Sequence, residues 1–223
     1  MEPKSLVPRF FDGTAKSYDS VVKYATFGRD SFWKKQIIRQ IPNAQKILEL
    51  ACGTGILTGM IAQKFPHSTI VGIDITENYL EMAKRKLGSY QNISFVCQDA
   101  ETLELEEKFD CIVSSYIPKY CDSRILVPKY IRHLKPGGKI ILHDFTFPKN
   151  KSVQFFWNLH FVMLRIMGSF IPEWSEAFAK LPKLIRASAW MHDYWAELQK
   201  NGFDVITSHH TWGCSAMLVA TYR

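Results

Sequence analysis

The 223-residue sequence lacks several patterns that would assign it to common classes of protein. It has no internal repeat, low-complexity tract or linker, so we expect one domain over residues 1–223 with a full core. No apolar segment near the amino terminus has the length of a signal peptide, and nothing directs the chain to secretion. The cysteines are odd in number and scattered without a C-x-x-C pair, which indicates reduced, mostly buried thiols in a cytoplasmic protein and no evident metal cluster.

Two phosphate-binding motifs are incomplete. An apolar strand expected at 46–50 runs into a turn that contains Gly53 and Gly55, and a helix follows at once. A dinucleotide fingerprint requires a third glycine where this chain has Thr58. No Lys-Ser or Lys-Thr pair follows the glycines, which excludes a P-loop. The turn is therefore a poor match to an NAD site and no match to a triphosphate site.

The same turn is nevertheless suited to a nucleoside. Gly53 and Gly55 allow the backbone to approach a ligand closely, because glycine has no Cβ. Asp74 ends a second strand expected at 69–73, where a carboxylate can accept both hydroxyls of a ribose. Glu49 places negative charge near the first strand end, which suits a ligand that carries an ammonium and a sulfonium. These residues predict S-adenosylmethionine as the cofactor, although many α/β proteins have a glycine-rich turn after their first strand.

The later segments extend this pattern. Thr76 is a plausible N-cap for a helix that ends at Gly88, and strands are expected at 93–97, 109–114 and 139–145, the last after a turn at 135–138. Strands that alternate with helices predict a parallel sheet with ligands at the carboxyl ends of the strands. In the turn after the third strand, Asp99 could accept a hydrogen bond from an adenine amino group, and Ala100 leaves room for the ring. Each candidate contact falls at a strand end.

The stretches LELACGTG, VGID, CQDAE, FDCIVSS and LKPGGKIIL resemble those of class I S-adenosylmethionine-dependent methyltransferases. The flanks RFFDGTAKSYDSVVKYATFGRDSFWKK, HDFTFP and GFDVITSHHTWGCSAMLVATYR are similar to UbiE-like enzymes, which C-methylate the ring of prenylated quinone precursors. The resemblance implies an α/β fold with a Rossmann-like, doubly wound sheet of seven mostly parallel strands, the last antiparallel, and a helical lid. The chain departs from these enzymes after Ser115, where Tyr116-Ile117-Pro118-Lys119-Tyr120 replaces a Gly-Leu-Arg-Asn-like segment.

The resemblance carries the cofactor site over to particular residues. It implies that Gly53 and Gly55 lie under the methionine portion, and that Tyr18 and Lys34 close over the cofactor and meet its carboxylate. For Lys34 the alternative is a solvated helix charge. The full expected cofactor-binding set is Tyr18, Lys34, Glu49, Ala51, Gly53, Gly55, Thr58, Asp74, Ile75, Asp99, Ala100 and Ser115.

An apolar insert distinguishes the second half of the chain. We expect an N-terminal helical cap at 1–42 and an insert at 150–189 whose first part, 155–171, is rich in aromatic and aliphatic residues. Asn158, His160, Arg165 and Gly168 interrupt it, which argues against a transmembrane helix. A lid over an apolar substrate, a helix in the bilayer interface with Lys149, Lys151 and Arg165 near the headgroups, or simple packing on the core are the alternatives.

Carbon methylation of a phenol-like ring requires a deprotonated hydroxyl, so a base should face the pocket. His143 and Asp144, at the end of the fifth strand, and Tyr116, after the fourth, are the catalytic candidates. His160 and His192, expected on lid helices, are further candidates. An amine substrate would instead need aromatic rings around the cation, for which the chain offers Trp157, Trp174 and Tyr120.

The formal net charge of +7 is compatible with two kinds of anionic partner, nucleic acid and an anionic membrane. Methyltransferases that act on exocyclic amines of bases carry Asn or Asp-Pro-Pro-Tyr after the fourth strand, whereas this chain reads Ser114, Ser115, Tyr116, Ile117. We therefore expect no nucleic acid partner, an apolar small-molecule or lipid substrate, and a cytoplasmic protein that can meet a membrane surface. A lipid or small-molecule N- or O-methyltransferase and a non-methylating S-adenosylmethionine-binding protein are the alternative functions.

Overall fold

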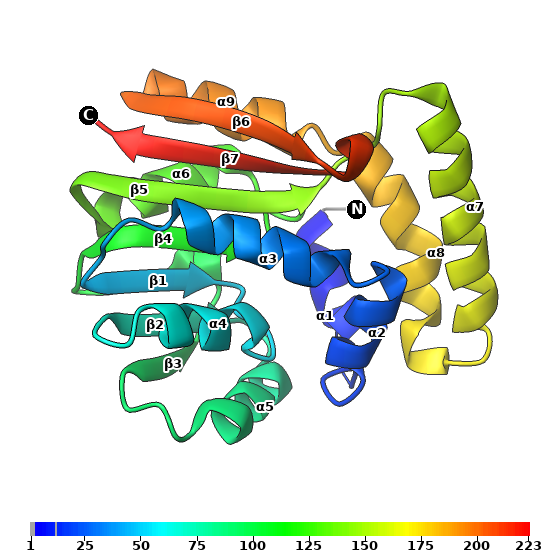
Figure 1. Ribbon diagram of the computed structural model, residues 1–223, viewed down its shortest axis with the longest axis horizontal. Coiled ribbons are helices and arrows are strands. Elements are labelled where there is room, and N and C mark those ends of the chain that lie inside the picture. The colour runs from blue at the N-terminus through cyan, green and yellow to red at the C-terminus, as the bar shows by residue number, and fades with distance from the viewer. Residues whose placement is uncertain (1–2, 12) are drawn as a thin grey trace.

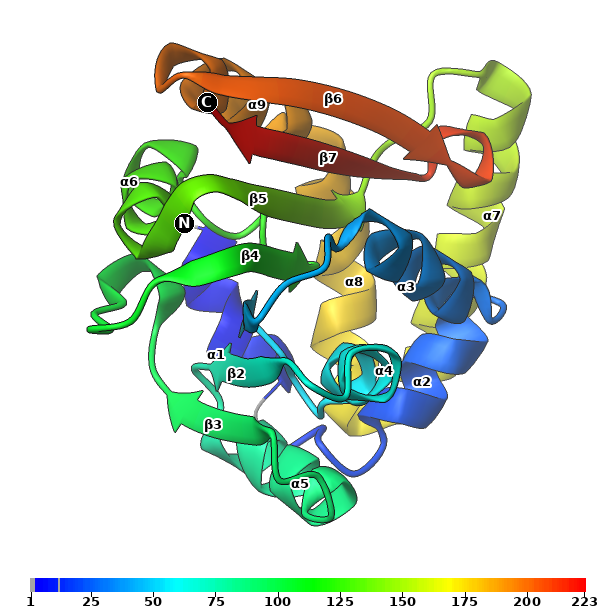
Figure 2. The ribbon, with the colours of Figure 1, turned by 60° about the vertical axis from the view of Figure 1, so that its left-hand side comes forward.

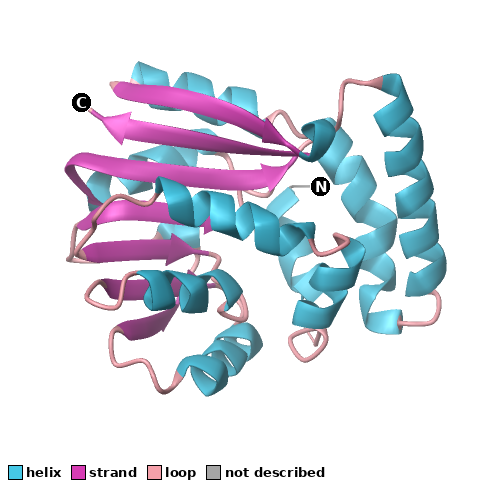
Figure 3. Cartoon of the chain, viewed as in Figure 1, coloured by secondary structure: helices cyan, strands magenta, loops and turns pink. Residues whose placement is uncertain are grey.

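A computed structural model describes residues 3–11 and 13–223, and its centre is a seven-stranded sheet (Figures 1 and 3). The strand order is β3-β2-β1-β4-β5-β7-β6. Neighbouring strands pair in parallel except for β7, which is antiparallel to both β5 and β6. The predicted α/β fold class, with an antiparallel last strand, is confirmed. The strands are β1 (Lys46–Leu50), β2 (Thr69–Asp74), β3 (Ile93–Cys97), β4 (Phe109–Ser115), β5 (Leu134–Phe145), β6 (Phe203–His210) and β7 (Ser215–Tyr222).

Helices cover both faces of the sheet (Figure 2). One face is covered by α3 (Arg29–Gln40), α4 (Ile56–Lys64) and α5 (Glu77–Leu87), and the other by α6 (Ser123–His133) and α9 (Trp190–Lys200). The central strands are apolar on both sides, as strands between two helical layers must be. Ile47 packs on the α3 and α4 side, and Leu48 packs on the α6 and α9 side. This alternation divides the core of the sheet into two clusters.

A second group of helices stands at the carboxyl ends of the parallel strands (Figure 1). It consists of α1 (Leu6–Phe11), which the 3₁₀ turn η1 (Pro3–Ser5) precedes, α2 (Tyr18–Ala25), and the long helices α7 (Lys151–Gly168) and α8 (Pro172–Ala187). Phe10, Tyr120, Leu164 and Trp174 meet in a third apolar cluster between these helices and the loop after β4. The amino-terminal segment and the 150–189 insert therefore pack on each other, although more than a hundred residues separate them in the sequence. Two further 3₁₀ turns are η2 (Ala100–Thr102) and η3 (Thr211–Gly213).

Thr76 and Gly88 flank α5 as N-cap and C-cap, as expected, although the Thr76 side chain makes no capping hydrogen bond. Three other local expectations differ from the structure. The turn expected at 135–138 lies inside β5, where the register with β4 shifts between the Phe109–Leu134 pair and the Cys111–Lys139 pair. His192 lies on α9 rather than on a lid helix, and its side chain is 80% exposed. Cys97 is exposed and two other cysteines are half-buried, so the expectation of mostly buried thiols is only partly correct.

Candidate functional site

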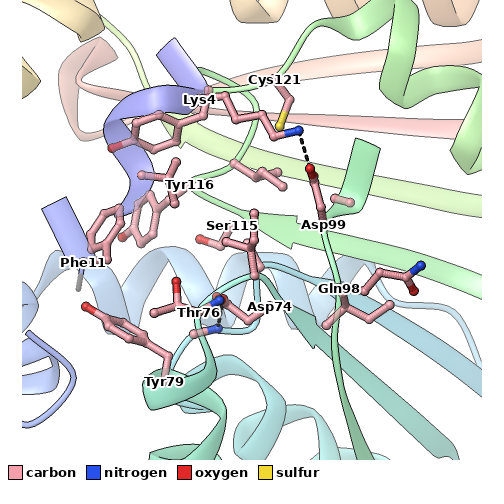
Figure 4. A pocket seen from close by; sticks show the side chains of 18 of the residues that line it. Lys4, Phe11, Asp74, Thr76, Tyr79, Gln98, Asp99, Ser115, Tyr116 and Cys121 are labelled. Carbon is pink, nitrogen blue, oxygen red and sulfur yellow. Dashed lines mark hydrogen bonds and ion pairs between the residues drawn. The ribbon is translucent and has the colours of Figure 1, made fainter. Parts of the chain in front are cut away.

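A cavity opens where β1, β2 and β4 end, and we name it the strand-end cavity (Figure 4). The turn after β1, the end of β2, the segment after β3 and the end of β4 form one side, and α1 covers the other. Most of the residues expected to bind the cofactor line it: Tyr18, Ala51, Gly53, Asp74, Ile75, Asp99, Ala100 and Ser115. The structure thus brings eight of the twelve expected cofactor residues together at one edge of the sheet.

Asp74 is tied into the backbone at the base of this cavity. One carboxylate oxygen accepts a hydrogen bond from the Gly53 amide at 2.8 Å, and the other accepts one from the Thr76 amide at 2.9 Å. Burial raises the pKa of Asp74, and these backbone donors oppose the rise. The Thr76 side chain and the Ile75 amide also donate to this carboxylate, which is therefore held in one orientation at the base of the cavity.

The Asp99 carboxylate is paired with a lysine of the amino-terminal segment. One of its oxygens accepts a hydrogen bond from the Glu101 amide at 3.0 Å, and the other forms an ion pair with Lys4, which also pairs with Glu101 at 2.5 Å. Although burial lowers the pKa of Lys4, the two carboxylates raise it overall. The segment before α1 is thus held over the side of the cavity where an adenine contact is expected (Figure 4).

Four expected cofactor residues do not line the cavity. Glu49 and Thr58 are buried beneath it, where the Thr58 hydroxyl donates to the Glu49 carboxylate at 2.7 Å. Burial raises the pKa of Glu49 to about 8, and Lys34 and Thr58 oppose this rise. Gly55 has φ +80°, and a Cβ there would lie 2.8 Å from the Leu87 side chain. This glycine therefore serves the packing of α4 against α5.

Lys34 is also absent from the cavity lining, yet it is not solvated. Its side chain is buried and forms an ion pair with the buried Asp30, one turn earlier on α3. Asp30 also accepts a hydrogen bond from the Tyr116 hydroxyl at 2.6 Å. The alternative of a solvated helix charge is wrong, because Lys34, Asp30 and Tyr116 form one buried network.

A second cavity, which we name the apolar cavity, lies between α2, α7, α8 and the loop after β4. Its lining is mainly aromatic and aliphatic, with Trp33 from α3, Phe145 from β5, and Trp157 and Leu164 from α7. Among the described residues that line it there is no carboxylate. We use the name aromatic wall for the four residues that it shares with the strand-end cavity, Phe11, Tyr18, Tyr116 and Tyr120.

Tyr116 is the one expected catalytic residue that faces both cavities. Its backbone has φ +73°, which is strained for a bulky residue and is typical of functional sites. The ring stacks on Phe145 at 4.9 Å between centroids. Burial, followed by the nearby Asp30 carboxylate, raises the pKa of Tyr116 well above its usual value. The phenol is therefore neutral at physiological pH.

His143 and Asp144 line neither cavity. Both ring nitrogens of His143 have partners, the hydroxyl of Ser115 at 3.2 Å and that of Ser215 at 2.8 Å. Burial lowers the pKa of His143 well below its usual value. Asp144 accepts hydrogen bonds from the Lys119 amide at 3.0 Å and from the Lys119 ammonium at 2.8 Å. Neither side chain is free to take a proton from a ligand.

The residues considered for an amine substrate and the lid histidine are present in the apolar cavity but have structural partners. The Trp174 indole donates to the Ser17 hydroxyl at 2.9 Å, and the His160 ring lies 2.8 Å from the Ala25 carbonyl. Trp157 is buried on the inner side of α7. These contacts tie α8 and α7 to α2 and help to close the cavity.

Lys119 and Asp30 are buried at this site, although neither was expected from the sequence to have a role. For each residue, a feature of the sequence indicates burial or pairing. Lys119 stands between apolar residues in the segment that departs from the quinone enzymes, where a solvated lysine would be out of place. Asp30 and Lys34 have the spacing of an ion pair on one helix face. Within residues 3–11 and 13–223, no group of three or more potential ligands could hold a metal, and no helix has the length and apolarity to cross a bilayer.

A family profile and two curated relatives identify the family of this chain. The profile of the ubiE/COQ5 methyltransferase family matches residues 2–222. The chain is 30% identical over 181 residues to the ubiquinone/menaquinone biosynthesis C-methyltransferase UbiE of Desulfotalea psychrophila, which covers 78% of this chain and 73% of that protein. It is 32% identical over 148 residues to the malonyl-[acyl-carrier protein] O-methyltransferase of Priestia megaterium, which covers 64% of this chain but only 52% of that protein.

A solved structure shows the same fold. The magnesium protoporphyrin IX methyltransferase of Synechocystis, with bound S-adenosylhomocysteine, superposes with a TM-score of 0.68 at 16% identity and covers 100% of both chains. At this level of identity the similarity concerns the fold alone.

Proposed function

Because the chain belongs to the ubiE/COQ5 methyltransferase family and is an S-adenosylmethionine-dependent methyltransferase, we propose that it methylates a ring carbon of an apolar aromatic acceptor, such as a prenylated quinone precursor. The observation that supports this acceptor is the pair of cavities on either side of the aromatic wall. A cavity at the strand ends that contains the carboxylates of Asp74 and Asp99 suits a nucleoside, and an adjoining cavity lined by aromatic and aliphatic residues suits a ring with an isoprenoid chain.

The residues of the strand-end cavity are suited to this cofactor. The Asp74 carboxylate lines this cavity at the position proposed for the ribose hydroxyls, and Ala51 and Gly53 line it at the position proposed for the methionine portion. Asp99 and Ala100 flank the side proposed for the adenine. When bound, S-adenosylmethionine supplies an electrophilic methyl group, so the protein mainly has to orient the acceptor and exclude water. The aromatic wall and the helices α7 and α8 perform that role in this proposal.

The test is calorimetric titration of the purified protein with S-adenosylmethionine and S-adenosylhomocysteine, followed by a methyl-transfer assay. The acceptors are a demethylmenaquinol with a short prenyl chain, kept reduced so that its ring carries hydroxyl groups, malonyl-acyl carrier protein and phosphatidylethanolamine, and NMR of the product locates the new methyl group. We expect cofactor binding and a new carbon-methyl bond on the quinol alone. Transfer to oxygen would instead support the O-methyltransferase alternative, which the similarity to the Priestia megaterium protein favours. Cofactor binding without transfer to the quinol would overturn the proposed acceptor.

We further propose that the outward face of α7 binds a membrane surface. This face carries a continuous set of exposed apolar side chains: Phe155, Phe156, Leu159, Val162, Met163, Ile166, Met167 and Phe170. Such a stripe on a soluble monomer is typical of an interaction site. Lys149, Lys151 and Arg165 are exposed beside it, as expected for a helix that lies among anionic headgroups. Phe156 and Trp212 are exposed and also line the apolar cavity, so an acceptor could enter from the bilayer.

The prediction for this surface uses a matched pair of variants. Replacing Val162 and Ile166 together with serine should reduce binding to phosphatidylcholine and phosphatidylglycerol vesicles by at least about tenfold, because each side chain contributes on the order of 1 kcal/mol when it enters the interface. Ile206→Ser on β6, where Ile206 is 73% exposed away from α7, is the control and should leave binding unchanged. Cosedimentation measures both. Equal binding of the double variant and the control would rule out this face.

A further inference from the structure

The apolar cavity has an unbalanced charge. Lys119 and Arg29 line it, and among its described lining residues there is no Asp or Glu. Lys119 is 5% exposed, so solvent does little to screen it. A ligand in this cavity therefore meets positive charge without a facing carboxylate.

Lys119 is held rigidly by the strand ends. Its ammonium donates to the Tyr116 carbonyl at 2.7 Å and to the Asp144 carboxylate at 2.8 Å. The ammonium nitrogen lies 4.3 Å from the centre of the Tyr120 ring and 5.5 Å from that of Tyr116, and both rings belong to the aromatic wall. An ammonium has three donors, and these two hydrogen bonds leave one for a ligand.

Asp144 forms a buried ion pair with Lys119 and offsets part of its charge. It lies on β5 outside the cavity lining, and its oxygens already accept hydrogen bonds from the Lys119 amide, the Lys119 ammonium and the Phe145 amide at 2.7 Å, so a ligand in the cavity meets the ammonium rather than the carboxylate. The other titratable groups beside Lys119 are Tyr116, Tyr120 and Cys121, and burial raises the pKa of all three, which keeps them neutral. Lys119 is thus the cation closest to the aromatic wall in the described lining.

We propose that Lys119 holds the acidic hydroxyl of the acceptor as its oxyanion. This inference rests on the proposed function and names the residue that positions its acceptor. The O–H bond breaks with its electron pair left on oxygen, and the proton passes to the buffer as the acceptor binds. The cavity then needs no free base. This agrees with the hydrogen bonds of His143 and Asp144, which leave neither side chain free to accept a proton from the acceptor. An amine would be disfavoured, because a second cation within a few ångströms of Lys119 is repelled.

The test follows the ionisation of a bound phenol and does not depend on turnover. The probe is para-nitrophenol with an ortho octyl chain, whose phenolate is read by visible absorbance in a pH titration with and without wild-type protein. A purely apolar cavity would raise the pKa of the bound phenol, whereas a cation at hydrogen-bond distance should lower it by about one unit or more. A bound-probe pKa equal to or above that in water, or no binding of the probe, would overturn the proposal on the wild-type protein alone.

Two variants identify the responsible cation. Lys119→Met should raise the pKa of the bound probe by at least about one unit relative to wild type, which is a tenfold change in proton affinity. Lys119→Arg, which keeps the charge, should retain most of the lowering of the probe pKa. Arg29→Met is the matched control on the same cavity and should retain it fully. Loss of the lowering in Arg29→Met but not in Lys119→Met would overturn the assignment. If the probe ionises as expected but no quinol is methylated, Lys119 holds oxyanions while the proposed function is wrong.

Discussion

Replacing Asp74 with alanine is expected to weaken S-adenosylmethionine binding by roughly 100-fold. Asp74 is proposed to accept two hydrogen bonds from the ribose, and hydrogen bonds to a charged group contribute about 1.5–3 kcal/mol each. The variant also leaves the Gly53 and Thr76 amides without their acceptor, which loosens the turn under the cofactor. Calorimetric titration with S-adenosylmethionine and S-adenosylhomocysteine measures the loss directly.

Asp110 provides a matched control for this substitution. It also accepts two backbone hydrogen bonds, from the Gln45 and Lys46 amides at 3.0 and 2.8 Å, but it lies at the opposite end of the sheet, near the start of β4. Asp110→Ala should therefore cost comparable structural stability and leave cofactor affinity unchanged. If both variants lost affinity equally, the effect would come from general loosening of the sheet, and Asp74 would have no direct role.

The second large effect is a fall in stability with rising pH that Glu49 causes. Its carboxyl is 2% exposed, and burial raises its pKa from 4.5 to about 8. Between these values the folded protein keeps a proton that the unfolded chain has released. The free energy of unfolding should therefore fall as the pH rises, by about 1.4 kcal/mol per pH unit, and level off above about pH 8.

Urea unfolding of the wild type and of Glu49→Gln at several values between pH 5 and 9 tests this sign. Glutamine has no proton to lose and can keep a hydrogen bond with Thr58. The free energy of unfolding of the variant should therefore rise relative to that of the wild type as the pH rises. The comparison cancels contributions from other buried groups such as Asp74 and Asp144, since they are present in both proteins. Parallel curves for the two proteins would mean that Glu49 is already ionised in the fold.

The sequence was most informative where function depends on a short local motif. The strand, glycine turn and helix at 46–64 and the carboxylate of Asp74 could be predicted because their contacts lie within one βαβ unit. The same motif led to a wrong prediction for Gly55 and Thr58, which were expected to bind the cofactor but do not line the strand-end cavity. Both lie in the turn region, but their neighbours are Leu87 and Glu49, so a helix and a buried carboxylate, and not the cavity, explain the residue types.

The acceptor side could not be predicted in the same way, because its contacts join distant segments. Asp30 on α3 meets Tyr116 after β4, and Lys119 meets Asp144 at the end of β5. Spacing along the chain gives no indication of either pair. The sequence placed His143 and Asp144 correctly at a strand end, yet it could not show that their hydrogen-bonding capacity is used by Ser115, Ser215 and Lys119.

The aromatic wall has a practical consequence for handling the protein. Phe11 and Tyr18, two of its four residues, come from the first eighteen positions, and Lys4 is bound to the segment after β3. Shortening the amino terminus to improve crystals, or cleaving it during purification, would join the two cavities into one and remove a cover from the nucleoside side. The chain ends after β7, at the end of the strands opposite to α1 and α2 (Figure 1). An affinity tag is best attached at that end.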